Sequence, residues 1–193
     1  HEHKMQYYSS QKKEPFVPKK EDSAKGKKWL AMTDVQYVDM SKLVAIPTGY
    51  KELDKKIIGL LMGDVTVLSG LSGSGKTSWI DCVVLNAVQR GYKVGIWSGE
   101  LQDFRFQSWI DQISAGKNYV CKKEGYENYY YAPKNIANQI NKWLEGKLFL
   151  YNNNYGSKWQ QLFADIKTLV ENEGTQLIVL DNLMALQIDS YDG

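Results

Sequence analysis

The chain has 193 residues, of which 43% are hydrophobic and 12% aromatic, so it suits one folded domain of ordinary size and excludes a disulfide-stapled miniprotein or a wholly disordered chain. No run approaches the ~18 apolar residues of a membrane span, so we expect a protein without a membrane partner. The 24 Lys and Arg residues nearly balance the 22 Asp and Glu residues, so charge alone does not indicate nucleic-acid binding.

The first 28 residues differ from the rest in composition. They hold eight Lys against four acidic residues, contain Pro15 and Pro18, and show no hydrophobic periodicity. We predict a basic linker or tail over 1–28 and a folded domain over 29–193. Two interpretations of the tail remain open, namely a solvated segment or a basic arm that touches nucleic acid or a neighbouring subunit.

The two cysteines and the N-terminus bear on location. Cys82 and Cys121 lie far apart without C-x-x-C spacing, which offers no zinc site and suits a reducing compartment. The N-terminus lacks the apolar stretch of a secretory signal, and its Lys-rich tail is unlike an Arg-rich transit peptide. We therefore expect a cytoplasmic protein, with the mitochondrial matrix as the alternative.

Hydrophobic patterning predicts alternating strands and helices after residue 49. We expect a short helix over 50–57, strands over 65–68, 92–97, 147–151 and 177–180, and helices over 76–90, 102–115, 134–144 and 157–173. The segment 117–133 is expected to be irregular. Strands that alternate with helices indicate an α/β domain with a mostly parallel sheet flanked by helices.

A glycine-rich loop follows the first of the long apolar strands. The segment 70–77 matches G-x-x-x-x-G-K-[ST], in which backbone N–H groups wrap a polyphosphate, a lysine reaches the β- and γ-phosphates, and a hydroxyl binds Mg²⁺. The alternative, a flexible turn that joins strand to helix, does not require this spacing. The predicted nucleotide-binding residues are Gly70, Ser72, Gly73, Ser74, Gly75, Lys76, Thr77 and Ser78.

Two acidic residues follow predicted strands and can complete a hydrolytic site. Asp181 ends the apolar strand over 177–180, where open α/β sheets present ligand residues, and we predict that it binds Mg²⁺ together with Thr77. Glu100 follows the strand over 92–97 and is a candidate to accept a proton from the attacking water. The alternatives are an N-cap or turn role for Asp181 and a helix first-turn role for Glu100.

Several segments together resemble a known family. The segment 46–54, followed by Gly63-Asp64 and the phosphate loop, resembles the entry to the RecA-like ATPase domain of hexameric replicative DNA helicases of the DnaB and Twinkle type. Trp97-Ser98-Gly99-Glu100-Leu101 resembles their catalytic-glutamate element, 104–116 is similar to phage primase-helicases, and Leu180-Asp181-Asn182-Leu183 resembles their Walker B strand. The resemblance covers 46–116 and 175–187 and is weak over 117–146.

The resemblance implies a RecA-like P-loop fold, ATP and Mg²⁺ as ligands, Glu100 as the general base, and a homo-hexameric ring that moves on single-stranded DNA. Because further strands, DNA-binding loops and an arginine finger follow the Walker B strand in that family, we expect 29–193 to be the N-terminal part of its ATPase domain, with the C-terminal strands missing. Such a piece of a larger helicase or primase-helicase would hydrolyse ATP slowly or not at all. Two other interpretations stay open: another RecA-like ATPase of recombination or repair, and a non-catalytic nucleotide-dependent assembly module.

Aromatic and cationic residues outside these motifs allow two interpretations each. The tyrosines at 126 and 129–131, with Lys117, Lys122 and Lys123 nearby, can stack nucleic-acid bases or form a packed surface loop. Arg105 can contact a phosphate or a subunit interface, or form an ion pair within its own helix region.

Overall fold

The computed structural model describes residues 28–35, 37, 39 and 42–187, so the predicted tail lies outside the described residues except for Lys28. The chain divides into two compact units, 1–68 and 69–193, which are described separately. In the described parts of the chain, no helix is long and apolar enough to cross a membrane.

The first unit is small and is held together by a polar turn. A 3₁₀ helix η2 (Met32–Asp34) precedes strand β1 (Ala45–Ile46), helix α2 (Lys51–Ile57) and strand β2 (Leu60–Leu61), which pairs antiparallel with β1. The Asp54 carboxylate on α2 accepts hydrogen bonds from the Thr48 hydroxyl at 2.6 Å and the Thr48 N–H at 2.9 Å. Because Thr48 is buried, these bonds fix the turn that leads into the predicted short helix.

The strand predicted over 65–68 is absent, and this prediction was wrong. Among the described residues no strand pairs with this segment, and Val65 and Val67 are 91% and 75% exposed. A β-branched run favours the extended conformation only weakly by itself, since strand stability comes from ladder bonds and from side chains packed on neighbouring strands.

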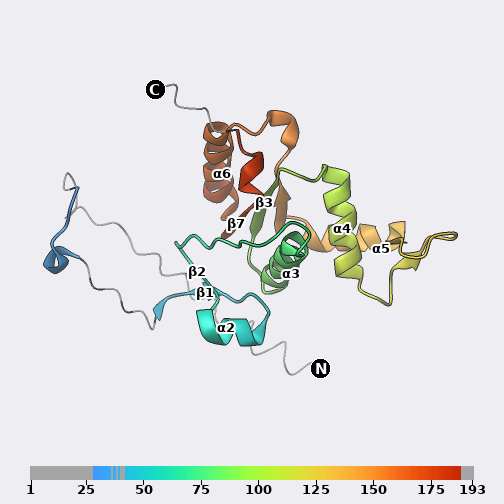
Figure 1. Ribbon diagram of the computed structural model, residues 1–193, viewed down its shortest axis with the longest axis horizontal. Helices are drawn as coiled ribbons and strands as arrows, with labels where there is room; N and C mark the ends of the chain where they lie inside the picture. Colours follow the sequence, from blue (N-terminus) through green and yellow to red (C-terminus); the bar gives the residue numbers. More distant parts are fainter. Residues whose placement is uncertain (1–27, 36, 38, 40–41, 188–193) are drawn as a thin grey trace. The chain divides into compact units, whose positions relative to one another are not determined.

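The second unit is built on a three-stranded parallel sheet in the order β6-β3-β7 (Figure 1). The central strand β3 (Val94–Ser98) is buried along its whole length, and its register pairs Val94 with Leu148 of β6 and Ser98 with Asp181 of β7. The remaining elements are α3 (Lys76–Gln89), α4 (Asp103–Ala115), β4 (Cys121–Lys122), β5 (Tyr130–Tyr131), α5 (Lys134–Leu144), β6 (Leu148–Leu150), η4 (Asn153–Tyr155), α6 (Trp159–Glu173), β7 (Leu177–Asp181) and η5 (Leu183–Ala185).

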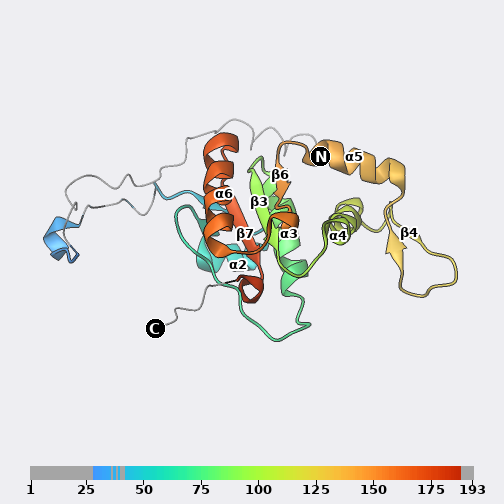
Figure 2. The ribbon, with the colours of Figure 1, turned by 90° about the horizontal axis from the view of Figure 1, so that it is seen from above.

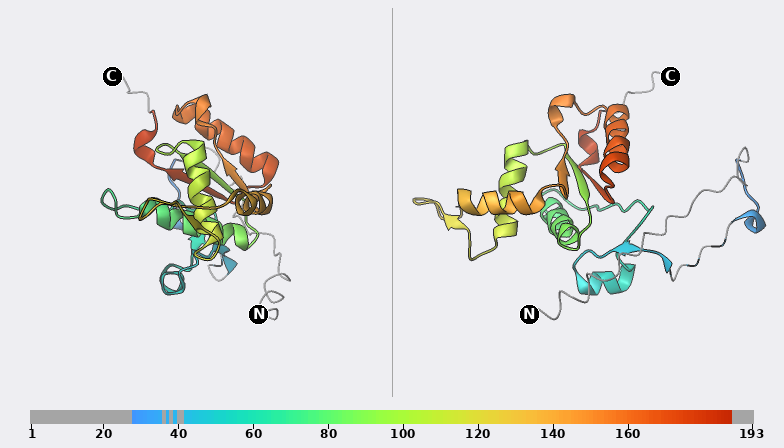
Figure 3. Two further views of the ribbon diagram at one scale, coloured as in Figure 1. Left: turned by 90° about the vertical axis from the view of Figure 1, so that its right-hand side faces the viewer. Right: turned by 180° about the vertical axis from the view of Figure 1, so that it is seen from behind.

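Helices cover both faces of this sheet. Helix α6 lies on one face and helices α3 and α4 lie on the other (Figure 2), and the side and rear views show the same layers (Figure 3). The chain passes from β3 to β6 through α4 and α5 and then returns through α6 to β7 on the other side of β3. This doubly wound order makes β3 the switch point, and ligands of such sheets bind beyond the carboxyl ends of the strands at that point.

The Leu169 side chain of helix α6 approaches the backbone of β3 at Gly95. A Cβ atom at Gly95 would lie 2.7 Å from the Leu169 Cδ2 atom and 3.0 Å from the Ile178 Cδ1 atom, so a larger residue there would require the Leu169 side chain to move. The predicted α/β class and the long helices are confirmed, with ends shifted by one or two residues. The segment 117–133, predicted to be irregular, instead contains the β4–β5 hairpin, which pairs Cys121 with Tyr131.

Candidate active site

The glycine-rich loop leads directly into helix α3. Gly73 and Gly75 have φ angles of +74° and +85°, which other residues rarely adopt, and Gly75 is the N-cap of α3. Gly75 has no side chain that could cap this helix, so the first-turn N–H groups and the positive end of the helix dipole are available to an anion. A Cβ atom at Gly70 would come within 3.1 Å of the Ser74 hydroxyl, so the loop also closes tightly on itself.

Lys76 is folded back onto the loop. Its ammonium group donates hydrogen bonds to the backbone carbonyls of Gly70 and Leu71, each at 2.9 Å. The cation therefore lies inside the curve of the loop, where a bound phosphate would meet it. A nucleotide that engages Lys76 must replace these two carbonyl acceptors with phosphate oxygens.

Thr77 and Asp181 come together although 104 positions separate them in the chain. The Thr77 hydroxyl at the start of α3 donates to the Asp181 Oδ2 atom at the end of β7, at 2.9 Å. Asp181 is the last residue of its strand and Asn182 is the N-cap of η5, so the N-cap alternative for Asp181 is wrong. Ser78 lies next along the first turn of α3 and is half-buried, and the roles of Ser72, Ser74 and Ser78 at a phosphate stay predictions.

The donor set fits Mg²⁺ better than a metal held entirely by protein. A hydroxyl and a carboxylate oxygen are hard ligands, and Mg²⁺ usually keeps waters and binds one or two protein groups plus substrate phosphates. Among the described residues no group of three or more His, Cys, Asp or Glu could hold a metal ion. Thr77 and Asp181 are thus the residues that would hold Mg²⁺ beside the loop.

Glu100 lies beyond the end of β3, next to the end of β7. The Gly99 N–H donates to the Asp181 carbonyl at 2.7 Å, which extends the ladder between the two strands by one bond. The Glu100 Oε1 atom accepts a hydrogen bond from the Asn182 side-chain amide. Helix α4 begins at Asp103 with Gln102 as its N-cap, so the first-turn alternative for Glu100 is wrong and its carboxylate is exposed.

A buried carboxylate near this site was missed by the sequence reasoning. Asp81 on α3 is 2% exposed, and burial, followed by the negative charge of Asp181, raises its pKa to about 7, while a hydrogen bond from the Trp109 side chain opposes the rise. Its Oδ2 atom has no hydrogen-bond partner in the described structure. The available signal was periodicity, because Asp81 shares one helix face with Thr77 and the buried residues Val84 and Val88.

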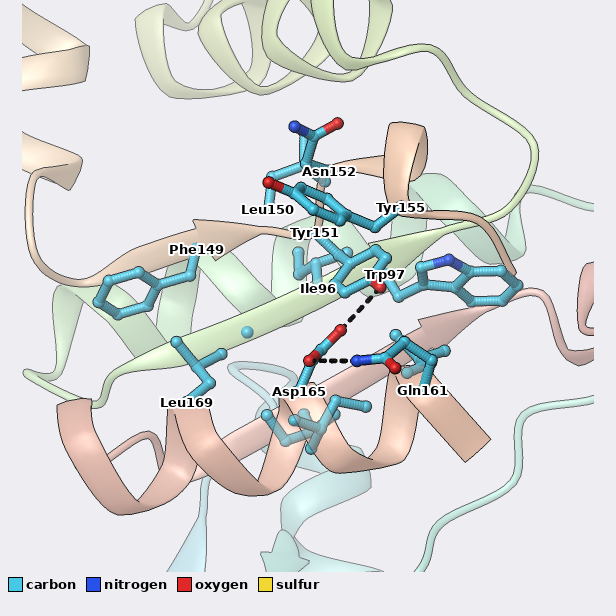
Figure 4. A pocket seen from close by; sticks show the side chains of 14 residues that line it. Ile96, Trp97, Phe149, Leu150, Tyr151, Asn152, Tyr155, Gln161, Asp165 and Leu169 are labelled. Carbon is cyan, nitrogen blue, oxygen red and sulfur yellow. Dashed lines mark hydrogen bonds between the residues drawn. The ribbon is translucent and has the colours of Figure 1, made fainter. Parts of the chain in front are cut away.

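A separate cavity of about 490 Å³ lies between the sheet and α6 (Figure 4). Its wall is mostly apolar. Among its polar residues, Asp165 accepts hydrogen bonds from the Tyr151 hydroxyl at 2.9 Å and the Gln161 amide at 2.8 Å. Burial, together with the Asp165 carboxylate, raises the pKa of Tyr151 to about 12. These groups satisfy one another, and none of the predicted site residues lines this cavity.

Arg105 and the tyrosine-rich segment are the remaining candidates from the sequence. In the described structure Arg105 forms no salt bridge, and its guanidinium lies 5.9 Å from the centre of the Phe104 ring, so the ion-pair interpretation is wrong. Lys123 on the β4–β5 hairpin lies over the rings of Tyr126 and Tyr129, at 4.7 and 5.1 Å. These rings remain about half exposed, and base stacking by the hairpin stays a prediction.

The family model and the curated relative that this chain matches both describe DNA helicases. Residues 45–192 match the family described as DnaB-like helicase C terminal domain. The chain is also similar to a "Probable plasmid replicative DNA helicase" from Chlamydia psittaci, with 26% identity over 153 residues. The aligned part covers 79% of this chain and 32% of that protein, so this chain spans about a third of the length of the curated relative it matches.

Proposed function

The chain belongs to the DnaB-like helicase family, whose RecA-like C-terminal domain it carries, and from this premise we propose that the protein hydrolyses ATP to move along single-stranded DNA as the motor of a replicative helicase. The observation that carries the proposal is the hydrogen bond of Thr77 to Asp181 beside the phosphate loop. It joins the residue that follows the loop lysine to a carboxylate at a strand end, the pair that a nucleotide-bound Mg²⁺ uses.

Each residue of the site then has a distinct role. The loop N–H groups and Lys76 bind the phosphates, with Lys76 leaving its two carbonyl acceptors for the β- and γ-phosphate oxygens. Thr77 and Asp181 hold Mg²⁺, which when bound neutralises charge on the phosphates. Glu100 accepts a proton from the water that attacks the γ-phosphate, a role that its exposed carboxylate at the switch point supports.

We also propose that the protein acts as a homo-hexamer, with ATP bound between subunits. Support comes from the family, whose members act on DNA and are typically hexameric, and from the relative that is named as a replicative DNA helicase. In a ring of this kind, the exposed phosphate loop and Glu100 would face a neighbouring subunit.

An ATPase assay of the full-length protein, with and without single-stranded DNA, tests the proposal. We expect DNA to stimulate hydrolysis, Glu100→Gln to lower kcat at least about 100-fold while ATP still binds, and Lys76→Ala to weaken ATP binding more than tenfold. Glu145→Gln, which changes an exposed carboxylate at the end of α5, is the matched control and should retain activity.

Two outcomes would favour other functions. Hydrolysis that ignores DNA would favour another RecA-like ATPase of recombination or repair. Nucleotide-dependent assembly without any hydrolysis, unaffected by Glu100→Gln, would favour a non-catalytic assembly module.

A further inference from the structure

The Asn182 side chain forms a hydrogen bond outside its own helix. As the N-cap of the 3₁₀ helix η5 it occupies a position where asparagine commonly accepts a hydrogen bond from the backbone of its own turn. Its side chain makes no such cap bond. Its amide instead donates to the Oε1 atom of Glu100, 82 positions away in the chain. The Asn182 side chain thus connects the ends of β3 and β7 instead of capping its own helix.

The backbone around this pair holds the two residues at a fixed separation. The Gly99 N–H donates to the Asp181 carbonyl at 2.7 Å, so the residues directly before Glu100 and Asn182 are bonded to each other. A Cβ atom at Gly99 would lie 2.4 Å from the Ala185 Cβ atom, so the η5 turn contacts the Glu100 loop at its backbone. Any larger residue at position 99 would push the two apart.

A second set of bonds anchors the Glu100 loop from the third strand. The Asn153 side-chain amide, just beyond β6, donates to the Ser98 carbonyl at 2.7 Å. The Ser98 hydroxyl accepts from the Leu101 N–H at 3.2 Å, and Ser98 itself is buried. These bonds fix the backbone on both sides of Glu100. The exposed Glu100 side chain can still rotate, so a partner is required to hold its carboxylate in one orientation.

We propose that Asn182 is a positioning residue for ATP hydrolysis, which holds the Glu100 carboxylate in the orientation that receives the proton of the attacking water. The inference rests on the proposed function, in which Glu100 is the general base. An amide suits the task because it is uncharged and donates without transferring a proton. It binds Oε1 and leaves Oε2 to accept from water, whereas a lysine at this position would neutralise the base.

The test is steady-state ATP hydrolysis by the full-length protein with single-stranded DNA. We expect Asn182→Ala to lower kcat about tenfold or more, with the KM for ATP and the affinity for a fluorescent ATP analogue changed less than twofold. Asn182→Asp keeps the shape but lacks the N–H donor, and should lose at least as much. Asn172→Ala, which changes an exposed residue in the last turn of α6, is the matched control and should retain wild-type kcat.

A double-mutant cycle separates positioning from a merely structural role. If Asn182 acts through Glu100, then Asn182→Ala should cause no further loss of kcat once Glu100→Gln is present. Losses that multiply in the double variant would overturn the inference, as would a kcat within twofold of wild type for both Asn182→Ala and Asn182→Asp. Thermal melting of each variant reports folding, and Asn182→Asp decides the matter if Asn182→Ala melts early.

The same measurements distinguish the two proposals. Loss of hydrolysis in Glu100→Gln, combined with normal kcat in both Asn182 variants, would overturn only the role of Asn182. Unchanged hydrolysis in Glu100→Gln would remove the general base from the proposed function and the role of Asn182 with it.

Discussion

Replacing Asp81 with asparagine should remove a pH-dependent loss of stability. In the folded chain the pKa of Asp81 lies at about 7 because of burial and then the charge of Asp181, against 3.8 for the ordinary group. Between about pH 4 and pH 7, the folded state therefore keeps a proton on Asp81 that the unfolded state has already released. This contribution to stability is complete below pH 4, declines as pH rises, and is lost above about pH 7.

The size of the effect follows from the pKa difference. Each unit corresponds to ~1.4 kcal/mol, so raising the pH from 5 to 8 should cost the wild-type protein about 2 to 3 kcal/mol relative to Asp81→Asn. The asparagine brings a constant penalty of about 1 to 3 kcal/mol, because its buried N–H₂ group replaces an Oδ2 atom that has no partner in the described structure. The change with pH, and not the offset, is the prediction.

Urea unfolding followed by tryptophan fluorescence at pH 5, 6, 7 and 8 measures this difference. The free energy of unfolding of Asp81→Asn should gain on that of the wild type with each step and level off above pH 7. The surface variant Asp64→Asn corrects for the general effect of exchanging an exposed carboxylate. A difference between wild type and Asp81→Asn that stays flat from pH 5 to pH 8 would refute the reasoning.

Three further predictions concern single contacts. Lys76→Ala should weaken ATP binding more than tenfold, measured by equilibrium dialysis, because no other side chain of the loop carries a positive charge. Gly95→Ala should lower the free energy of unfolding by about 1–3 kcal/mol in urea, because its Cβ atom would approach Leu169 at 2.7 Å; an unchanged midpoint would contradict that packing. Tyr151→Phe should cost about 1 kcal/mol through the lost bond to Asp165, and equal stability by calorimetry would exclude a contribution from that bond.

The sequence was most informative where one chain segment determines its own structure. Helix α3 and strand β7 follow from periodicity and from an apolar run. The register that pairs Ser98 with Asp181, which the sequence did not indicate, makes the ends of β3 and β7 neighbours. The phosphate-loop motif and the strand-end position of Asp181 together predicted that Thr77 and Asp181 share one site, and the hydrogen bond between them brings the two side chains together.

Features that depend on contacts between distant segments could not be predicted. The strand over 65–68 required a partner strand, which local propensity cannot supply. Nothing in the sequence around Asn182 indicates its partner, and only the approach of the two strand ends brings its side chain to Glu100. The charge state of Asp81 depends on Asp181 and Trp109, which lie 100 and 28 positions further along the chain.

Gly95 and Trp97 of β3 and Gly99 directly after it alternate along the chain, so all three share one face. Gly95 borders the cavity between the sheet and α6, where the flexible Leu169 side chain approaches it, whereas Gly99 lies against the Cβ atom of Ala185 in the η5 turn. A layer of side chains would absorb small displacements by rotamer changes, but contact with bare backbone leaves little room for such accommodation. The backbone directly before Glu100 therefore has little room to move toward the η5 turn, whereas the Leu169 side chain and the cavity beside Gly95 let β3 and α6 adjust to each other.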